Sequence, residues 1–175
     1  MRGIAIAIGL MLAGPRAGAT PTTFDAAMQG VLVEYGKIHG ALAGDSVRGV
    51  PEGAKAIERL AGKLPRPTGQ HAKHLGEIPA KLKAAAAQLS SARALEGARE
   101  AFKALSRPMA LWATLSRPSG INVVYCAMAK ASWLQRDRTI SNPYYGPKML
   151  RCGEVVSGKD KGAADGHMKR GGHAL

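Results

Sequence analysis

Four segments of the chain carry apolar residues at alternating spacings of three and four, the repeat of one face of an α-helix. These stripes cover residues 24–42, 50–64, 75–89 and 95–112. Ser90 and Ser91 either separate the last two helices or lie within one long helix, and the sequence leaves both possibilities open. The eight aromatic residues are few, and alanine is abundant, which favours closely packed helices over a β-sandwich. We therefore predict an all-α fold, an up-down-up-down four-helix bundle.

The segment after the helices has a different character. Residues 121–125 are rich in β-branched side chains and predict a short extended stretch. Both cysteines follow, together with turn-forming Asn-Pro and Gly-Pro steps in residues 142–147. We expect an irregular Cys/Met loop over residues 121–153, within one domain spanning residues 20–156. A disordered basic tail is expected over residues 157–175.

The first 19 residues have the features of a secretory signal. Arg2 gives a positive start, residues 4–13 are apolar, and Ala17-Gly18-Ala19 offers the small residues that signal peptidase accepts. The apolar stretch is shorter than the ~20 residues that a membrane span needs, so an uncleaved anchor is the lesser alternative. We expect cleavage after Ala19 and a periplasmic protein whose mature chain has no membrane span.

Charge, cysteine count and motifs exclude several functional classes. The chain has 25 Lys and Arg against 12 Asp and Glu, a net charge of +13, which favours anionic surfaces in general. Export argues against a specific nucleic-acid partner. Two cysteines exclude a disulfide-rich scaffold and an all-cysteine zinc site. No motif for nucleophilic, metalloprotease or phosphate chemistry is present, so we expect no catalytic residues, no organic cofactor and no enzymatic activity.

Four sulfur-bearing residues form the candidate site. Cys126 and Met128 are two residues apart, a spacing that puts both on one face of an extended segment. Met149 and Cys152 are three apart, which puts both on one face of a helical turn. If the intervening turns bring the pairs together, two thiolates and two thioethers form a metal site. Such soft ligands select Cu(I) or a similar ion.

The two cysteines also allow a simpler interpretation. In an oxidising compartment Cys126 and Cys152 form a disulfide, and the methionines are then packing residues. Closing this loop is worth about 3 kcal/mol in the chain-entropy model. The protein would then be a non-catalytic structural or interaction module. Free thiols are the third possibility, and reduced protein could bind metal where oxidised protein does not.

Four stretches of the C-terminal segment form a recognisable pattern: Tyr125-Cys126-Ala127-Met128-Ala129, Trp133-Leu134-Gln135, Ile140-Ser141-Asn142-Pro143-Tyr144-Tyr145-Gly146 and Lys148-Met149-Leu150-Arg151-Cys152-Gly153. The pattern resembles a bacterial exported domain of unknown function. That domain occurs alone or attached to periplasmic adaptor proteins of Cus-type copper and silver efflux systems. The helical part has weaker similarity to it, at Ala41-Leu42-Ala43, Asp45, Arg99, Phe102, Leu105 and Ser106.

The resemblance implies a role in heavy-metal handling. It implies Cys126, Met128, Met149 and Cys152 as metal ligands, and components of a periplasmic metal efflux system as partners. One position departs from the family pattern, because Ala127 stands where proline is usual. Proline would fix an extended backbone there, so the Cys126–Met128 pair is less rigid in this chain.

Overall fold

The computed structural model describes residues 23–157, so the expected leader and residues 158–175 of the expected tail lie outside the described part. In chain order the elements are α1 (Phe24–Ala43), α2 (Val50–Ala61), α3 (Ala72–Leu75), α4 (Ile78–Ser91), α5 (Leu95–Ser116), β1 (Asn122–Cys126), β2 (Ala131–Gln135), the 3-10 helix η1 (Gly146–Met149) and β3 (Glu154–Val155).

Each of the four long helices overlaps one predicted stripe, but α2 ends at Ala61 and α4 begins only at Ile78. Thr23 caps α1, because its hydroxyl oxygen accepts a hydrogen bond from the Ala26 N–H at 3.2 Å. The backbone leaves the helical conformation at Ala92, so α4 and α5 are separate helices and Ser91 is the last residue of α4. Pro108 lies inside α5, which continues past it to Ser116.

A three-stranded antiparallel sheet makes the fold mixed rather than all-α, so the predicted fold class is wrong. The strands lie in the order β2-β1-β3, with Val124 opposite Trp133 on one side and Val155 on the other. The predicted extended stretch at residues 121–125 corresponds to β1, whereas β2 and β3 were not predicted.

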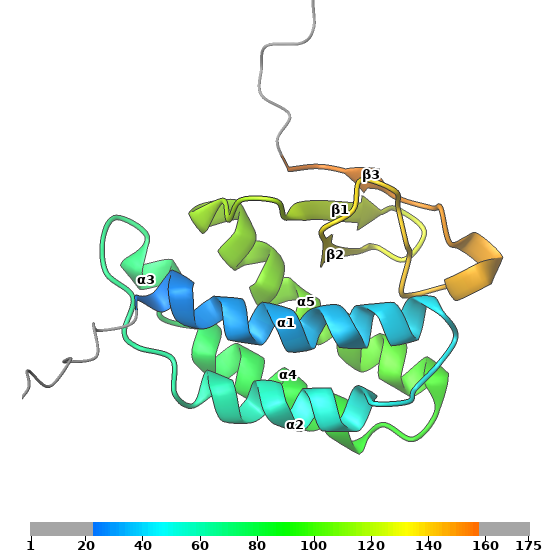
Figure 1. Cartoon of the computed structure of the whole chain (residues 1–175), viewed down its shortest axis with the longest axis horizontal. Helices are drawn as coiled ribbons and strands as arrows, with labels where there is room; N and C mark the ends of the chain where they lie inside the picture. The colour runs from blue at the N-terminus through cyan, green and yellow to red at the C-terminus, as the bar shows by residue number, and fades with distance from the viewer. Residues whose placement is uncertain (1–22, 158–175) are drawn as a thin grey trace, which may run out of the picture.

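The sheet also explains why the helices do not form the predicted up-down-up-down bundle. Helix α1 packs on α2, α2 on α4, and α4 on α5, but α1 and α5 make few contacts. The sheet lies over this side of the molecule and packs mainly through β2 on α5 (Figure 1). The strands therefore cover much of the apolar face of α5, and direct packing between α1 and α5 is limited.

One hydrophobic core joins the helices to the sheet. The Tyr35 ring on α1 stacks on Phe102 of α5, with ring centroids 4.8 Å apart. Phe102 contacts Tyr144, and Tyr144 meets the edge of Trp133 in β2 at 5.8 Å between centroids. This aromatic row runs from α1 to the loop that carries the second cysteine.

Within residues 23–157 no helix is both long and apolar enough to cross a bilayer.

Candidate functional site

The two cysteines meet at one end of the sheet. Cys126 is the last residue of β1 and is fully buried, opposite Ala131 of β2. Cys152 follows η1 and is half-buried. Their Sγ atoms lie 3.1 Å apart, and both thiols are free. The expectation that turns bring these residues together is therefore confirmed for the cysteines.

Asn142 holds the segment of Cys152 in place. Its side-chain N–H donates to the Cys152 carbonyl at 2.7 Å, and its backbone N–H donates to the Leu150 carbonyl at 2.8 Å. Its side-chain oxygen accepts from the Tyr144 N–H at 2.8 Å. Asn142 is fully buried, so each of these bonds is shielded from water. We assign it the role of fixing the turn, as its place before Pro143 indicates.

Gly153 allows the chain to pass close to the sheet. Its φ of +147° is unfavourable for any residue with a side chain. A Cβ atom there would lie 2.7 Å from the Trp133 ring and 3.1 Å from the Val124 side chain. Only glycine therefore lets Cys152 approach Cys126 while the next residue, Glu154, pairs with Tyr125 of β1.

Arg99 anchors the same loop to the helices. Its guanidinium donates to the Pro143 carbonyl at 3.0 Å and to the Leu42 carbonyl at 2.9 Å, and it pairs with the Asp45 carboxylate. The Arg99 side chain is only 15% exposed, so its two bonds to backbone carbonyls are better shielded from water than those of a surface arginine. Composition and spacing alone gave no sign of this contact, because its partners are more than 40 residues apart in sequence.

The two thiols have opposite shifts in acidity. Burial by itself raises the pKa of Cys126. Hydrogen bonds from the Cys152 thiol, from the N–H groups of Ala129 and Met128, and from Asn142 outweigh it, so the pKa is lowered. The hydrogen bond that Cys152 donates to Cys126 is the main reason why the pKa of Cys152 is raised. The pair therefore loses one proton readily and keeps the second between the sulfurs.

The methionines lie differently from the cysteines. Met128 is in the turn between β1 and β2, and 64% of its surface is exposed. The prediction that Cys126 and Met128 lie on one face of an extended segment is wrong, because β1 ends at Cys126 and the extended backbone does not reach Met128. Met149 is half-buried at the end of η1, and its carbonyl accepts from the Cys152 N–H at 2.9 Å. The predicted turn between Met149 and Cys152 is therefore present.

The donor set can be compared with the needs of metal ions. Among residues 23–157, no three or more His, Cys, Asp or Glu side chains gather as a metal site. A metal at the thiol pair would therefore rely on sulfur, which suits a soft ion of low coordination number. With metal–sulfur bonds of about 2.3 Å, two sulfurs are about 3.8 Å apart at a tetrahedral angle and about 4.6 Å apart in a linear arrangement. The observed sulfurs, 3.1 Å apart, would have to separate by about 0.7–1.5 Å to bind such an ion.

Aromatic side chains join the loop of Cys152 to the sheet. The Tyr144 hydroxyl donates to the Ser132 carbonyl at 2.6 Å, and the Trp133 indole N–H donates to the Gln135 side chain at 2.9 Å. Both residues are buried, and their packing and hydrogen bonds bind the loop to the sheet. The Tyr145 hydroxyl donates to the Met128 carbonyl at 3.2 Å, linking the loop to the β1–β2 turn.

Comparisons with protein-family models, curated protein sequences and solved structures found no match. The function is therefore argued from the thiol pair and from the motif residues themselves.

Proposed function

We propose that this protein binds a soft metal ion of the Cu(I) or Ag(I) type through Cys126 and Cys152, as a periplasmic binding or carrier protein linked to heavy-metal efflux. The observation that carries the proposal is the 3.1 Å contact between the two sulfur atoms at one end of the sheet. The motif resemblance supports the link to efflux, and partners from such a system are part of the proposal.

The environment of the thiols supports metal binding. A thiolate is the ligand form, and the hydrogen bonds around Cys126 favour its thiolate. Cys152 gives the pair a route to solvent, because it is half-buried whereas Cys126 is fully buried. The metal would take the place of the proton shared between the sulfurs. Affinity should therefore decrease as pH falls.

The same environment argues against an enzymatic dithiol. A thiol–disulfide oxidoreductase attacks its substrate with an accessible thiol of low pKa. Here the thiol with the lowered pKa is fully buried, and the accessible thiol has the raised pKa. The two properties are thus on different residues. This separation supports a site that receives an ion over one that turns over a substrate.

A second candidate is a structural or interaction module closed by a Cys126–Cys152 disulfide. A disulfide bond is about 2.05 Å long, so the sulfurs need to approach by only about 1 Å. The two states exclude each other, because each uses both sulfurs. Oxidation would therefore abolish metal binding until the disulfide is reduced.

Anaerobic titration of the reduced protein with Cu(I) and Ag(I) tests the proposal. We expect one ion per chain, and loss of that binding in Cys126→Ser and Cys152→Ser. Met128→Leu and Met149→Leu report whether a thioether adds to the affinity, and circular dichroism confirms that each variant is folded. Wild-type affinity in the double-cysteine variant would refute the metal site. Mass spectrometry of protein alkylated in its native compartment tells the disulfide from the reduced pair.

A further inference from the structure

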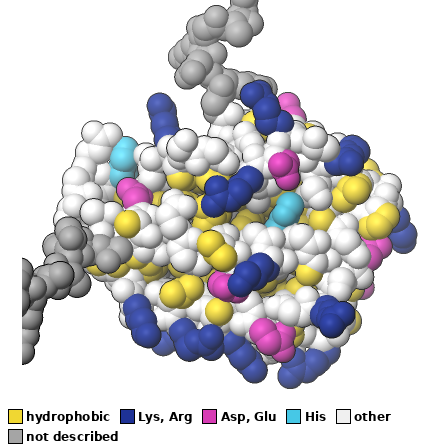
Figure 2. Space-filling model, viewed as in Figure 1, with side chains coloured by type: hydrophobic (Ala, Val, Ile, Leu, Met, Phe, Trp, Pro, Cys, Tyr) yellow, Lys and Arg dark blue, Asp and Glu magenta, His cyan; other side chains and the backbone are white. Residues whose placement is uncertain are grey.

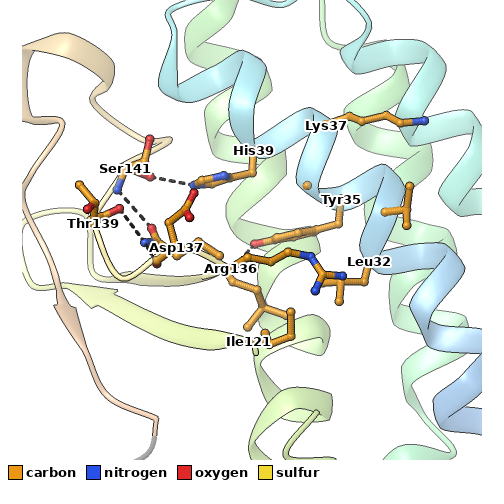
Figure 3. Close-up of a pocket in the computed structure, with 13 residues that line it drawn as sticks. Leu32, Tyr35, Lys37, His39, Ile121, Arg136, Asp137, Thr139 and Ser141 are labelled. Carbon is orange, nitrogen blue, oxygen red and sulfur yellow. Dashed lines mark hydrogen bonds between the residues drawn. The ribbon is translucent and has the colours of Figure 1, made fainter. Parts of the chain in front are cut away.

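A hollow of about 470 Å³ lies between α1 and the segment that follows β2 (Figure 3). It is at the end of the β1–β2 pair opposite to Cys126. Its walls come from α1, from the residue before β1 and from residues 134–141. Figure 2 shows hydrophobic side chains exposed between α1 and the sheet on this face. The volume is within the range of pockets that hold small organic ligands.

The α1 side of the hollow is apolar and has unfilled space. Leu32 and Val33 line it together with Ile121, and 52% of the Val33 surface is exposed. Gly36 also lines the hollow, and a Cβ atom built on it would have no neighbour within 4 Å. A glycine inside a helix costs about 0.5–1 kcal/mol relative to alanine. Here the missing side chain leaves room for a ligand beside the apolar wall.

One cation faces this apolar wall without a partner. Arg136 lies across the hollow toward Leu32 and forms no ion pair with any described residue (Figure 3). Lys37 also lines the hollow, but it points away along α1 and pairs with Glu34 at 2.7 Å. Arg136 is therefore the group that is free to receive an anion.

The opposite end of the hollow carries the negative charge of Asp137. Asp137 points toward His39, whose Nε2–H donates to the Ser141 carbonyl at 2.7 Å (Figure 3). Burial lowers the pKa of His39, so this ring is neutral near pH 7. The Asp137 carboxylate would repel a second negative charge on a ligand whose first charge is at Arg136.

The loop wall is held in shape before any ligand binds. The Gln135 side chain donates to the Thr139 and Asp137 carbonyls and accepts from the Ser141 N–H at 3.2 Å. The Asn122 side chain donates to the Arg136 carbonyl at 2.9 Å. These bonds fix residues 136–141, which follow β2 and are neither helix nor strand. A preformed wall reduces the entropy lost on binding.

From these contacts we propose that the hollow binds a small amphipathic monoanion, such as a medium-chain carboxylate. The apolar body lies against Leu32, Val33 and Ile121 in the space over Gly36, and the carboxylate binds the Arg136 guanidinium. This site is separate from the thiol pair and does not depend on the proposed metal function.

The test uses a fluorescent amphipathic monoanion, 1-anilinonaphthalene-8-sulfonate, displaced by competitors of equal chain length. We expect octanoate to displace the probe. Octylamine, octanol and the dianion suberate should need a concentration about tenfold higher than octanoate, or more, for the same displacement. Equal competition by octanoate and octylamine would overturn the proposal, because the anion would then have no role.

Two pairs of variants locate the binding. Arg136→Gln should weaken octanoate about tenfold, whereas Arg138→Gln, the same change at an exposed residue that does not line the hollow, should leave it unchanged. Gly36→Leu should abolish binding by filling the space, whereas Gly36→Ala controls for the gain in helix propensity. Wild-type binding by Gly36→Leu, or equal loss in the two arginine variants, would refute the site.

Discussion

The hydroxyl oxygen of Tyr35 accepts a hydrogen bond from the backbone N–H of Leu134 at 3.1 Å, which ties the first helix to the second strand. The same hydroxyl is 2.7 Å from the Ser106 hydroxyl on α5. All three partners are buried, and this burial raises the pKa of Tyr35 far above its ordinary value. One phenol therefore joins α1, α5 and the sheet where the helices alone do not close around the core.

Tyr35→Phe should destabilise the protein by about 2 kcal/mol, because it leaves the Leu134 N–H and the Ser106 hydroxyl buried without this partner. Ring stacking on Phe102 is kept, so the loss reports the hydroxyl alone. Urea unfolding followed by circular dichroism measures the change. Tyr125→Phe, at a ring that is 36% exposed, is the control and should change stability by less than about 0.5 kcal/mol. Equal stability of Tyr35→Phe and wild type would contradict the role of the hydroxyl.

Gly153→Ala should destabilise the protein by about 2–3 kcal/mol, because the backbone conformation is strained and the methyl group meets Trp133 and Val124. Displacement of the neighbouring Cys152 should also slow disulfide formation with Cys126 when the reduced protein is treated with diamide. Urea unfolding and thiol titration measure the two effects.

Gly97→Ala is the matched control for this change. Its Cβ would meet nothing within 4 Å, and it lies inside α5, so it should stabilise the protein by about 0.5–1 kcal/mol. A similar change in the free energy of unfolding in both variants would show that the close contacts at Gly153 do not determine its stability effect.

The helices were predictable because each buries one face, and the stripe of buried residues repeats along the sequence. The sheet was not, since β2 buries three consecutive residues, Trp133, Leu134 and Gln135, and shows no alternation. The turn before it, residues 127–130, contains no glycine, proline, asparagine or aspartate, and Lys130 adopts a positive φ of 49°. Nothing local therefore marked a hairpin.

The meeting of the two cysteines was predictable from the sequence, but the rest of the candidate site was not. Two cysteines in one short segment, separated by turn formers, indicate a meeting of thiols. The place of Met128 depends on the residue at which β1 ends, which spacing does not reveal. The contacts of Arg99 with the Cys152 loop and of Tyr35 with β2 are set by tertiary packing, so no local pattern reports them.

Alkylation should modify Cys152 before Cys126 in the reduced protein, because Cys126 is fully buried. The rate at Cys152 should rise with pH at a midpoint above the ordinary cysteine value of about 8.5, since its thiol donates a hydrogen bond to Cys126 and its pKa is raised. Iodoacetamide labelling at a series of pH values, followed by peptide mass spectrometry, measures both.

In the Cys126→Ser variant the thiolate neighbour is absent, so the midpoint for Cys152 should move down toward the ordinary value. An unchanged midpoint in this variant would show that the thiols do not share a proton. Faster labelling of Cys126 than of Cys152 would contradict the buried position of Cys126.

Acidification should destabilise the protein through His39. Burial lowers the pKa of this ring in the folded state below its ordinary 6.5, and the hydrogen bond to Ser141 only partly offsets this. Between the two pKa values the unfolded chain binds a proton that the folded chain does not, so stability is full above about pH 7 and is lost as pH falls toward the folded pKa. The slope due to this residue is at most about 1.4 kcal/mol per pH unit. Urea unfolding at pH 5, 6, 7 and 8 measures the free energy of unfolding, which should depend less on pH in His39→Gln than in wild type. His74→Gln, at an exposed ring, is the control and should keep the wild-type slope. The same slope in all three proteins would contradict an origin at His39.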